Sequence, residues 1–115
     1  MRFTTKDSGK REEYNSGMVR DVQEGKPDFT YLLIPGVAYK DQPIIRLIEL
    51  YMRGAEKYGR YNWTKADSEE ELQRFKQSGL RHHMQYLCGE TDEDHQAAVL
   101  FNIIATMYVE DKLGQ

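Results

Sequence analysis

Cysteines, a signal peptide and long apolar runs are scarce or absent in this sequence. Its 115 residues include one cysteine, Cys88, so no internal disulfide can form, which fits a reducing compartment. The first residues, 1–11, are polar and charged and lack the apolar core of a signal peptide. The longest apolar run, 97–109, is shorter than the roughly 20 residues that a membrane-spanning helix needs. We therefore expect a cytoplasmic protein without membrane contact, in which Cys88 is a small buried hydrophobe.

An excess of basic residues is also absent. The net charge is −3 and the calculated pI is near 5.6. Because domains that bind duplexes usually carry a basic patch, a nucleic acid polymer is not the expected partner. A small phosphorylated ligand is still compatible with this charge, since a metal ion can neutralise it locally. The length favours a single domain, 1–115, that can form a hydrophobic core without disulfide bonds.

Apolar periodicity predicts an all-α fold with a three-helix core, over residues 41–59, 68–88 and 91–112. Pro43 suits the first turn of the first helix, and Gly59 suits its end. Ser68 and Glu71 have the capping-box spacing that opens the second helix. Residues 1–40, which glycine and proline interrupt, are expected to form a long irregular arm that packs on the core. Within the arm, the sequence leaves open whether 29–34 is a strand or a loop.

A polar stripe interrupts the otherwise apolar third helix. At about 100° per residue, His95, Asn102 and Thr106 lie on one side of that helix. An unpaired buried polar group costs on the order of 1–3 kcal/mol, so these side chains need other side chains, a metal ion or a ligand as partners. For Thr106 a bond to its own backbone is sufficient. For His95 and Asn102, a structural network and a functional site are both open.

Carboxylates on two of the predicted helices are candidate metal ligands. Glu49 lies between apolar neighbours and is expected to be buried, whereas Glu56 on the same face is expected to be solvated. Asp92 and Asp94 fall in the expected first turn of the third helix, where they also complement the helix dipole. With His95, these carboxylates would suit a hard divalent ion such as Mg²⁺ or Mn²⁺.

Three consecutive residues of the second helix combine one cation with two imidazoles. Arg81 can clamp phosphate oxygens, and a histidine can serve as acid, base or metal ligand. Adjacent histidines on a helix cannot point the same way. The apolar pattern places His83 on the core side, which leaves His82 at the helix surface.

The loop after the first helix and the arm hold further candidates for binding a nucleotide. A cation, two aromatic rings and an amide lie close together there, in Lys57, Tyr58, Asn62 and Trp63. An aromatic ring stacks on a nucleobase with roughly 1–3 kcal/mol, although a lone tryptophan in a small helical protein also fits the core. Arg20 and Lys26 of the arm could close over the site, but their spacing is not that of a P-loop.

Several motifs taken together resemble a known family. In chain order they are Ser16-Gly17, Arg20-Asp21, Glu24-Gly25-Lys26-Pro27, Arg53-Gly54-Ala55-Glu56-Lys57-Tyr58-Gly59, Asn62-Trp63, Ser78, Arg81-His82, Gly89-Glu90, Asp92-Glu93-Asp94-His95 and Asn102. Over about residues 14–110 the chain resembles the phage-associated dATP/dGTP diphosphohydrolase N-terminal family, which includes MazZ-like nucleotide pyrophosphohydrolases. This resemblance implies hydrolysis of a purine dNTP to dNMP and pyrophosphate with Mg²⁺ or Mn²⁺, in the cytoplasm of a phage-infected or prophage-carrying bacterium.

Under this enzyme hypothesis the candidate residues take three roles. The catalytic set is Glu49, His82, His95 and Asn102. The metal-binding set is Glu49, Asp92, Asp94 and His95. The substrate-binding set is Arg20, Lys26, Lys57, Tyr58, Asn62, Trp63 and Arg81.

Two other functions stay open at this stage. The chain could be a phage protein that binds a nucleotide or cyclic nucleotide without hydrolysing it, in which case its carboxylates are structural. It could also be a phosphohydrolase similar to the His-Asp class, with His82, Asp94 and His95 as metal ligands. Because three helices leave one side of the core open, we also expect a homo-oligomer, a dimer or larger, with the site near the interface.

Overall fold

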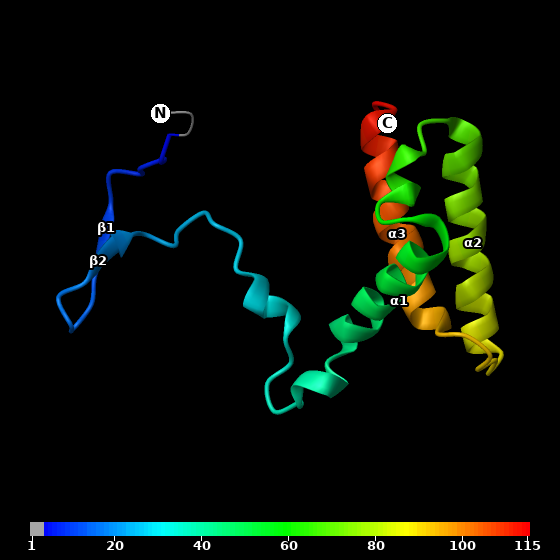
Figure 1. Ribbon diagram of the computed structural model, residues 1–115, viewed down its shortest axis with the longest axis horizontal. Helices are drawn as coiled ribbons and strands as arrows, with labels where there is room; N and C mark the ends of the chain where they lie inside the picture. Colours follow the sequence, from blue (N-terminus) through cyan, green and yellow to red (C-terminus); the bar gives the residue numbers. More distant parts are fainter. Residues whose placement is uncertain (1–3) are drawn as a thin grey trace. The chain divides into compact units, whose positions relative to one another are not determined.

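The computed structural model describes residues 4–115 and is mostly helical (Figure 1). The chain divides into two compact units, Met1–Tyr31 and Leu32–Gln115. The predicted all-α core of three helices is confirmed, with α1 (Pro43–Tyr58), α2 (Glu69–Leu87) and α3 (His95–Lys112) all in the second unit. No helix within the described part of the chain has both the length and the apolar character to cross a bilayer. The single-domain organisation and the packing of the arm on the core stay predictions.

The first unit contains a short hairpin where the sequence predicted irregular structure. Strands β1 (Arg11–Glu13) and β2 (Val19–Asp21) pair antiparallel, with Glu12 opposite Arg20. Gly17 has a φ of +88° and forms the turn between them, a conformation that glycine adopts without strain. The hairpin was not predicted because three-residue strands are too short to show an alternating pattern.

The remaining elements are three short 3-10 helices, η1 (Phe29–Leu32), η2 (Tyr39–Asp41) and η3 (Asn62–Lys65). The segment 29–34 is therefore mostly a 3-10 turn rather than a strand. Just before α1, the buried side chain of Gln42 forms hydrogen bonds to the backbone of the preceding loop. Its amide oxygen accepts from the Ile34 N–H at 2.8 Å, and its Nε2 donates to the carbonyls of Ile34 at 3.0 Å and Val37 at 2.8 Å.

Local sequence signals place the ends of α1 and α2 correctly. Pro43 is the first residue of α1, and Gly59, with a φ of +89°, follows its last turn. Ser68 caps α2, since its Oγ accepts from the Glu71 N–H at 3.2 Å. The Glu71 carboxylate in turn accepts from the Ser68 hydroxyl at 2.7 Å and from the Asp67 N–H at 3.1 Å. The predicted capping box is confirmed.

The third helix begins later than predicted. Its first residue is His95, and Asp94 is the N-cap, with a carboxylate that accepts from the Ala97 N–H at 3.1 Å. Because Asp94 is the residue that caps the helix, Asp92 and Glu93 precede the first helical turn and lie in the loop. The acidic cluster is thus part of the α2–α3 connection.

The main packing contact of the second unit is the antiparallel pair α2–α3, and α1 packs on α3 (Figure 1). Toward one end of the pair, Leu72 and Val109 are fully buried. Farther along, the α2 backbone comes close to α3 at Gly79, where an added Cβ would lie 3.1 Å from the Cβ of Asn102. The antiparallel course places the end of α2 beside the start of α3.

Aromatic side chains fill the space between α1, η3 and α3. The ring centroid of Trp63 lies 5.5–5.9 Å from those of Tyr51, Phe101 and Tyr108. Tilted and edge-to-face contacts of this kind are the favoured geometry of packed aromatic rings. Trp63 is therefore half-buried in an aromatic cluster, and its role in binding a nucleobase stays a prediction.

Candidate functional site

A buried pair of histidines lies where the end of α2 meets the start of α3. His95 is 2% exposed and His82 is 9% exposed. Their Nδ1 atoms are 2.8 Å apart, within hydrogen-bonding distance. The burial of His95 was predicted from the polar stripe and is confirmed. The pairing with His82 was not predicted.

The orientation of His82 corrects the prediction for the second helix, because His82 points inward and His83 is exposed. The prediction followed the apolar pattern of the second helix, yet Leu87, which belongs to that pattern, is 64% exposed. The buried face of α2 instead includes Phe75 and Gly79, and His82 lies three residues after Gly79 on that face. The apolar pattern alone could not show which of the two faces α3 covers.

A carboxylate orients His95 from the outer side. The Nε2–H of His95 donates to Oδ1 of Asp92 at 2.8 Å. This bond holds the pKa of Asp92 below its usual value, so that carboxylate is an ionised acceptor. The tautomer of His95 that carries its hydrogen on Nε2 turns the lone pair of Nδ1 toward His82. Burial lowers the pKa of His82, which favours the neutral imidazole at that position.

Asn102, the second residue of the polar stripe, is 5% exposed, as predicted. Its Nδ2 donates to the Ala98 carbonyl at 2.8 Å and contacts the Ser78 hydroxyl at 3.4 Å. It lies two turns beyond His95, which corresponds to about 10 Å along the axis of α3. These contacts are those of a structural network between α2 and α3. Thr106 is half-buried on the same helix.

Two overlapping groups of side chains near the α2–α3 loop have donor atoms close enough to share a metal ion. The first is His82, Glu93 and His95, and the second is Glu90, Asp92 and His95. Within each group the donor atoms all lie within 4.8 Å of one another. The predicted ligands His95 and Asp92 therefore do come together, with Glu90 and Glu93, which belong to the quoted motifs but were not among the predicted metal ligands.

Two burial predictions are wrong. Glu49 is exposed on α1 and belongs to neither donor group, because the face of α1 that contacts α3 carries Leu47 and Tyr51. Cys88 is also exposed, since it is the C-cap that follows the last turn of α2. Neither side chain is held in the buried environment that the sequence predicted.

Asp94, another predicted metal ligand, is occupied by structural bonds. The Arg46 Nε and Nη2 atoms donate to its two carboxylate oxygens at 2.8 and 2.6 Å. The Arg46 guanidinium holds the pKa of Asp94 below its usual value. The same carboxylate caps α3, so Asp94 links α1 to the start of α3 and lies in neither donor group.

The predicted substrate-binding residues of the second unit are spread along it. Arg81 is exposed beside His82, with its Nη2 3.4 Å from the Ser78 hydroxyl. Lys57 and Tyr58 are exposed at the end of α1. Asn62 is exposed in η3, which packs near Tyr108, about 20 Å along α3 from His95. Of this set, Arg81 is the residue adjacent in sequence to the histidine pair.

The two arm residues of the substrate-binding set belong to the first unit. Arg20 is exposed in β2, and the Lys26 ammonium lies 3.2 Å from an Asp21 carboxylate oxygen. Asp21 also accepts hydrogen bonds from the backbone and hydroxyl of Ser8, which helps to hold its pKa below the usual value. Lys26 thus has an acidic partner within its own unit.

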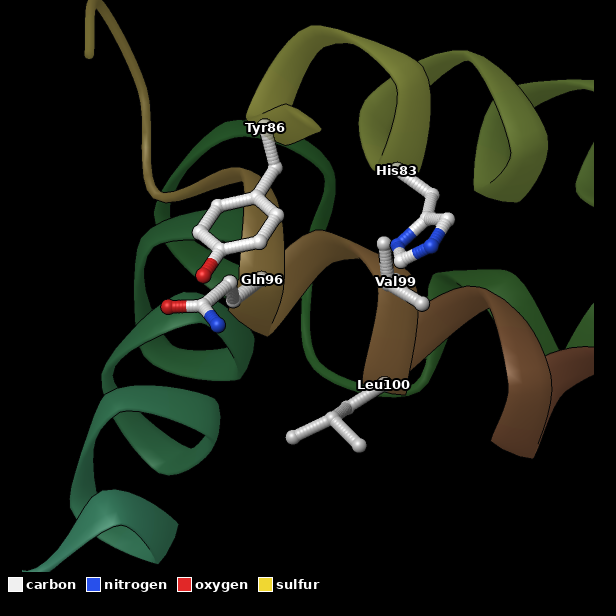
Figure 2. A pocket seen from close by; sticks show the side chains of 5 residues that line it. All are labelled: His83, Tyr86, Gln96, Val99 and Leu100. Carbon is white, nitrogen blue, oxygen red and sulfur yellow. The ribbon is translucent and has the colours of Figure 1, made fainter. Parts of the chain in front are cut away.

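Two open hollows lie over the start of α3, and Figure 2 shows the larger of them. The larger, of about 250 Å³, has walls from His83 and Tyr86 of α2 and from Gln96, Val99 and Leu100 of α3. The smaller, of about 140 Å³, shares Gln96 and Leu100 with it. Neither hollow includes the histidine pair or a residue of the predicted sets. The candidate site is therefore defined by the converging donor atoms and not by surface shape.

Fold and site together define a small helical protein with a histidine–carboxylate cluster at the junction of two helices. The family described as "dATP/dGTP diphosphohydrolase, N-terminal" matches residues 16–114, so the chain belongs to that family, as its motifs predicted. The match covers the three helices and strand β2, but not strand β1. No curated protein and no solved structure matches the chain.

Proposed function

We propose that this protein hydrolyses a purine deoxynucleoside triphosphate, dATP or dGTP, to the monophosphate and pyrophosphate. The family name supplies the substrate class. The structural observation that carries the proposal is the hydrogen-bonded series from Asp92 through His95 to His82. Buried imidazoles that are aligned in this way, beside a loop with three further carboxylates, are typical of sites for acid–base or metal-assisted chemistry.

A divalent ion, Mg²⁺ or Mn²⁺, is part of the proposal, and the donor chemistry is compatible with one. The residues that would hold it are His82, Glu93 and His95, or His95 with Asp92 and Glu90. Imidazole nitrogens suit Mn²⁺ better than Mg²⁺, which prefers oxygen ligands. A divalent ion supplies activation of water and neutralisation of phosphate charge.

Other side chains of the chain would bind and orient the substrate. Arg81 is exposed next to His82, and its planar guanidinium can pair with two phosphate oxygens at once. Neutralising charge on the triphosphate favours departure of pyrophosphate. The more distant candidates Lys57, Tyr58 and Asn62 would contact parts of the nucleotide away from the reacting phosphorus.

The proposal is tested by incubating the protein with each of the four dNTPs and Mn²⁺ or Mg²⁺, and by separating the products. Release of dNMP and pyrophosphate from dATP or dGTP supports it. Arg81→Ala should raise the KM for dNTP, while Arg74→Ala, which removes another exposed arginine of α2, should leave the KM unchanged. Stoichiometric nucleotide binding without turnover would contradict hydrolysis and favour the nucleotide-binding alternative.

A further inference from the structure

Two imidazole nitrogens and a carboxylate converge at the loop between α2 and α3. We infer that His82, Glu93 and His95 form a binding site for a six-coordinate transition-metal ion of the Mn²⁺ or Co²⁺ type. Only the ion's role in turnover rests on the proposed function, whereas its binding can be measured without substrate. The sequence predicted a different set of ligands for Mg²⁺ or Mn²⁺, namely Glu49, Asp92, Asp94 and His95.

The first argument is the arrangement of hydrogens on His95. Its Nε2–H donates to Asp92 at 2.8 Å, so Nδ1 keeps its lone pair on the inner side. Metal-binding histidines usually have a carboxylate behind them in this way, because the bond fixes the tautomer and the ring orientation. His95 is 2% exposed, so packing also restricts its ring.

The second argument is the distance between the two imidazoles. The Nδ1 atoms of His82 and His95 lie 2.8 Å apart. Two ligands at about 2.1–2.2 Å from an ion lie about 3.0 Å apart at a right angle and about 3.4 Å apart in a tetrahedron. The two Nδ1 atoms would therefore need to move apart only slightly to bind a six-coordinate ion. They would need to move farther apart to bind tetrahedral Zn²⁺.

Metal binding at this point requires a change of tautomer at His82. Without an ion, His82 donates its Nδ1–H to the Nδ1 of His95. With an ion bound to both Nδ1 atoms, His82 carries its hydrogen on Nε2 instead. The carboxylate of Glu93, whose donor atom lies within 4.8 Å of those of both histidines, adds an oxygen ligand of negative charge.

The third argument is an unsatisfied acceptor on the face of α2 that carries His82. Within residues 4–115, Oε1 of Gln85 is the buried side-chain atom that has no hydrogen-bond partner. Gln85 lies three residues after His82, so the two share a face of α2. A buried acceptor without a donor costs free energy, and a water of a hydrated cation would satisfy it.

Local charge also favours a cation here. The N-terminus of α3 carries partial positive charge, which disfavours a cation. The C-terminus of α2 lies a few residues from His82 and carries partial negative charge, which favours a cation. Asp92, Glu93 and Glu90 add formal negative charge in the loop between the helices. The donor set and the charge balance are therefore both suited to a divalent transition metal.

The test is a titration of the full chain with Co²⁺, followed by its visible absorption spectrum, and with Mn²⁺ and Mg²⁺ by calorimetry. We expect one Co²⁺ per chain, with the weak bands of six-coordinate cobalt, and tighter binding of Mn²⁺ than of Mg²⁺. Glu93→Gln and His82→Gln should each lower Co²⁺ affinity 10–100-fold or more. Their matched controls, Glu49→Gln and His83→Gln, change exposed residues and should leave it unchanged.

Glu93 is exposed, so Glu93→Gln keeps the inference testable even where His82→Gln prevents folding, which circular dichroism would show. Affinity that is unchanged in Glu93→Gln and in folded His82→Gln overturns the site, as does a failure to bind Co²⁺ and Mn²⁺. Metal binding without dNTP turnover supports the site and contradicts the proposed function. Full Mn²⁺-dependent turnover in Glu93→Gln, together with an unchanged Co²⁺ affinity, supports the function and overturns the site.

Discussion

Three neighbouring acidic residues before α3 have different partners, so single substitutions among them should have different effects. Asp92 accepts from His95, and Asp94 accepts from Arg46 and from the α3 backbone. Glu93 lies in a donor group with the histidine pair. At the scale of residues, a carboxylate that we propose as a metal ligand and a carboxylate with structural bonds are therefore adjacent in the sequence.

Asp94→Ala should lower the free energy of unfolding by about 1 kcal/mol, because α3 loses its N-cap. The ion pair with Arg46 adds little, since the Arg46 side chain is 51% exposed. Urea unfolding measures the change. Asp111→Ala is the control, as Asp111 is an exposed aspartate near the other end of α3 and should cost nothing. Equal losses in the two variants would contradict the capping role.

The burial of a single side chain could be predicted only where the apolar pattern of its helix allowed one interpretation. His95 and Asn102 interrupt an apolar run, so their burial followed from periodicity. For α2 the same reasoning failed, because Leu80, Met84 and Leu87 form an apolar stripe that the described chain leaves exposed. Which of two apolar faces is covered depends on the tertiary partner, and no local pattern specifies it.

At the scale of elements, the helix ends that depend on one or two side chains were predictable and the others were not. The Ser68–Glu71 box and the glycine after α1 act locally, within one turn. The start of α3 was misplaced because any of three consecutive acidic residues could have been the cap. The hairpin of the first unit depends on a turn and on paired charges rather than on strand periodicity.

The capping box of α2 should make stability depend on pH. Hydrogen bonds from Ser68 and from the Asp67 backbone hold the pKa of Glu71 below its usual value. The folded state therefore binds the proton less tightly than the unfolded state, and the stabilisation is present above the unfolded pKa and lost as pH falls through the folded one. The difference in unfolding free energy between wild type and Glu71→Gln should shrink between pH 7 and pH 3. A difference that stays constant over this range would contradict the role of the ionised carboxylate.

Two helical glycines provide a matched test of the close approach between α2 and α3. Gly54→Ala should stabilise the protein by about 0.5–1 kcal/mol, because alanine is the better helix former and nothing lies within 4 Å of the added Cβ. Gly79→Ala should destabilise it, because the new Cβ would lie 3.1 Å from the Cβ of Asn102, which is fixed to the α3 backbone. Thermal unfolding of the two variants measures both signs. A stabilising Gly79→Ala would show that the helices are not this close.

At the scale of the whole molecule, the second unit leaves much apolar surface uncovered. On α3, Leu100, Ile103 and Met107 are exposed at spacings of three and four residues. Apolar residues at this spacing form a stripe along which two helices can pack together. Two copies of the same stripe can pack against each other around a two-fold axis. The self-association expected from the sequence stays a prediction, and this stripe is where we expect it.

Size-exclusion chromatography with light scattering should find a dimer or a larger oligomer at micromolar concentration. Ile103→Glu should shift the mass to that of a monomer, because it places a charge in the middle of the apolar stripe. Gln73→Glu, which changes an exposed residue on α2, should leave the mass unchanged. A monomeric wild type would contradict the prediction.

The rate of pyrophosphate release from dATP and dGTP with Mn²⁺ tests the central claim most directly, when it is measured for wild type, Glu93→Gln and His83→Gln. The account predicts turnover by the wild type and by His83→Gln, and a loss of at least 10–100-fold in Glu93→Gln. Turnover that is equal in all three, or the lack of turnover in the wild type, would contradict a hydrolytic site at the His82–His95 pair.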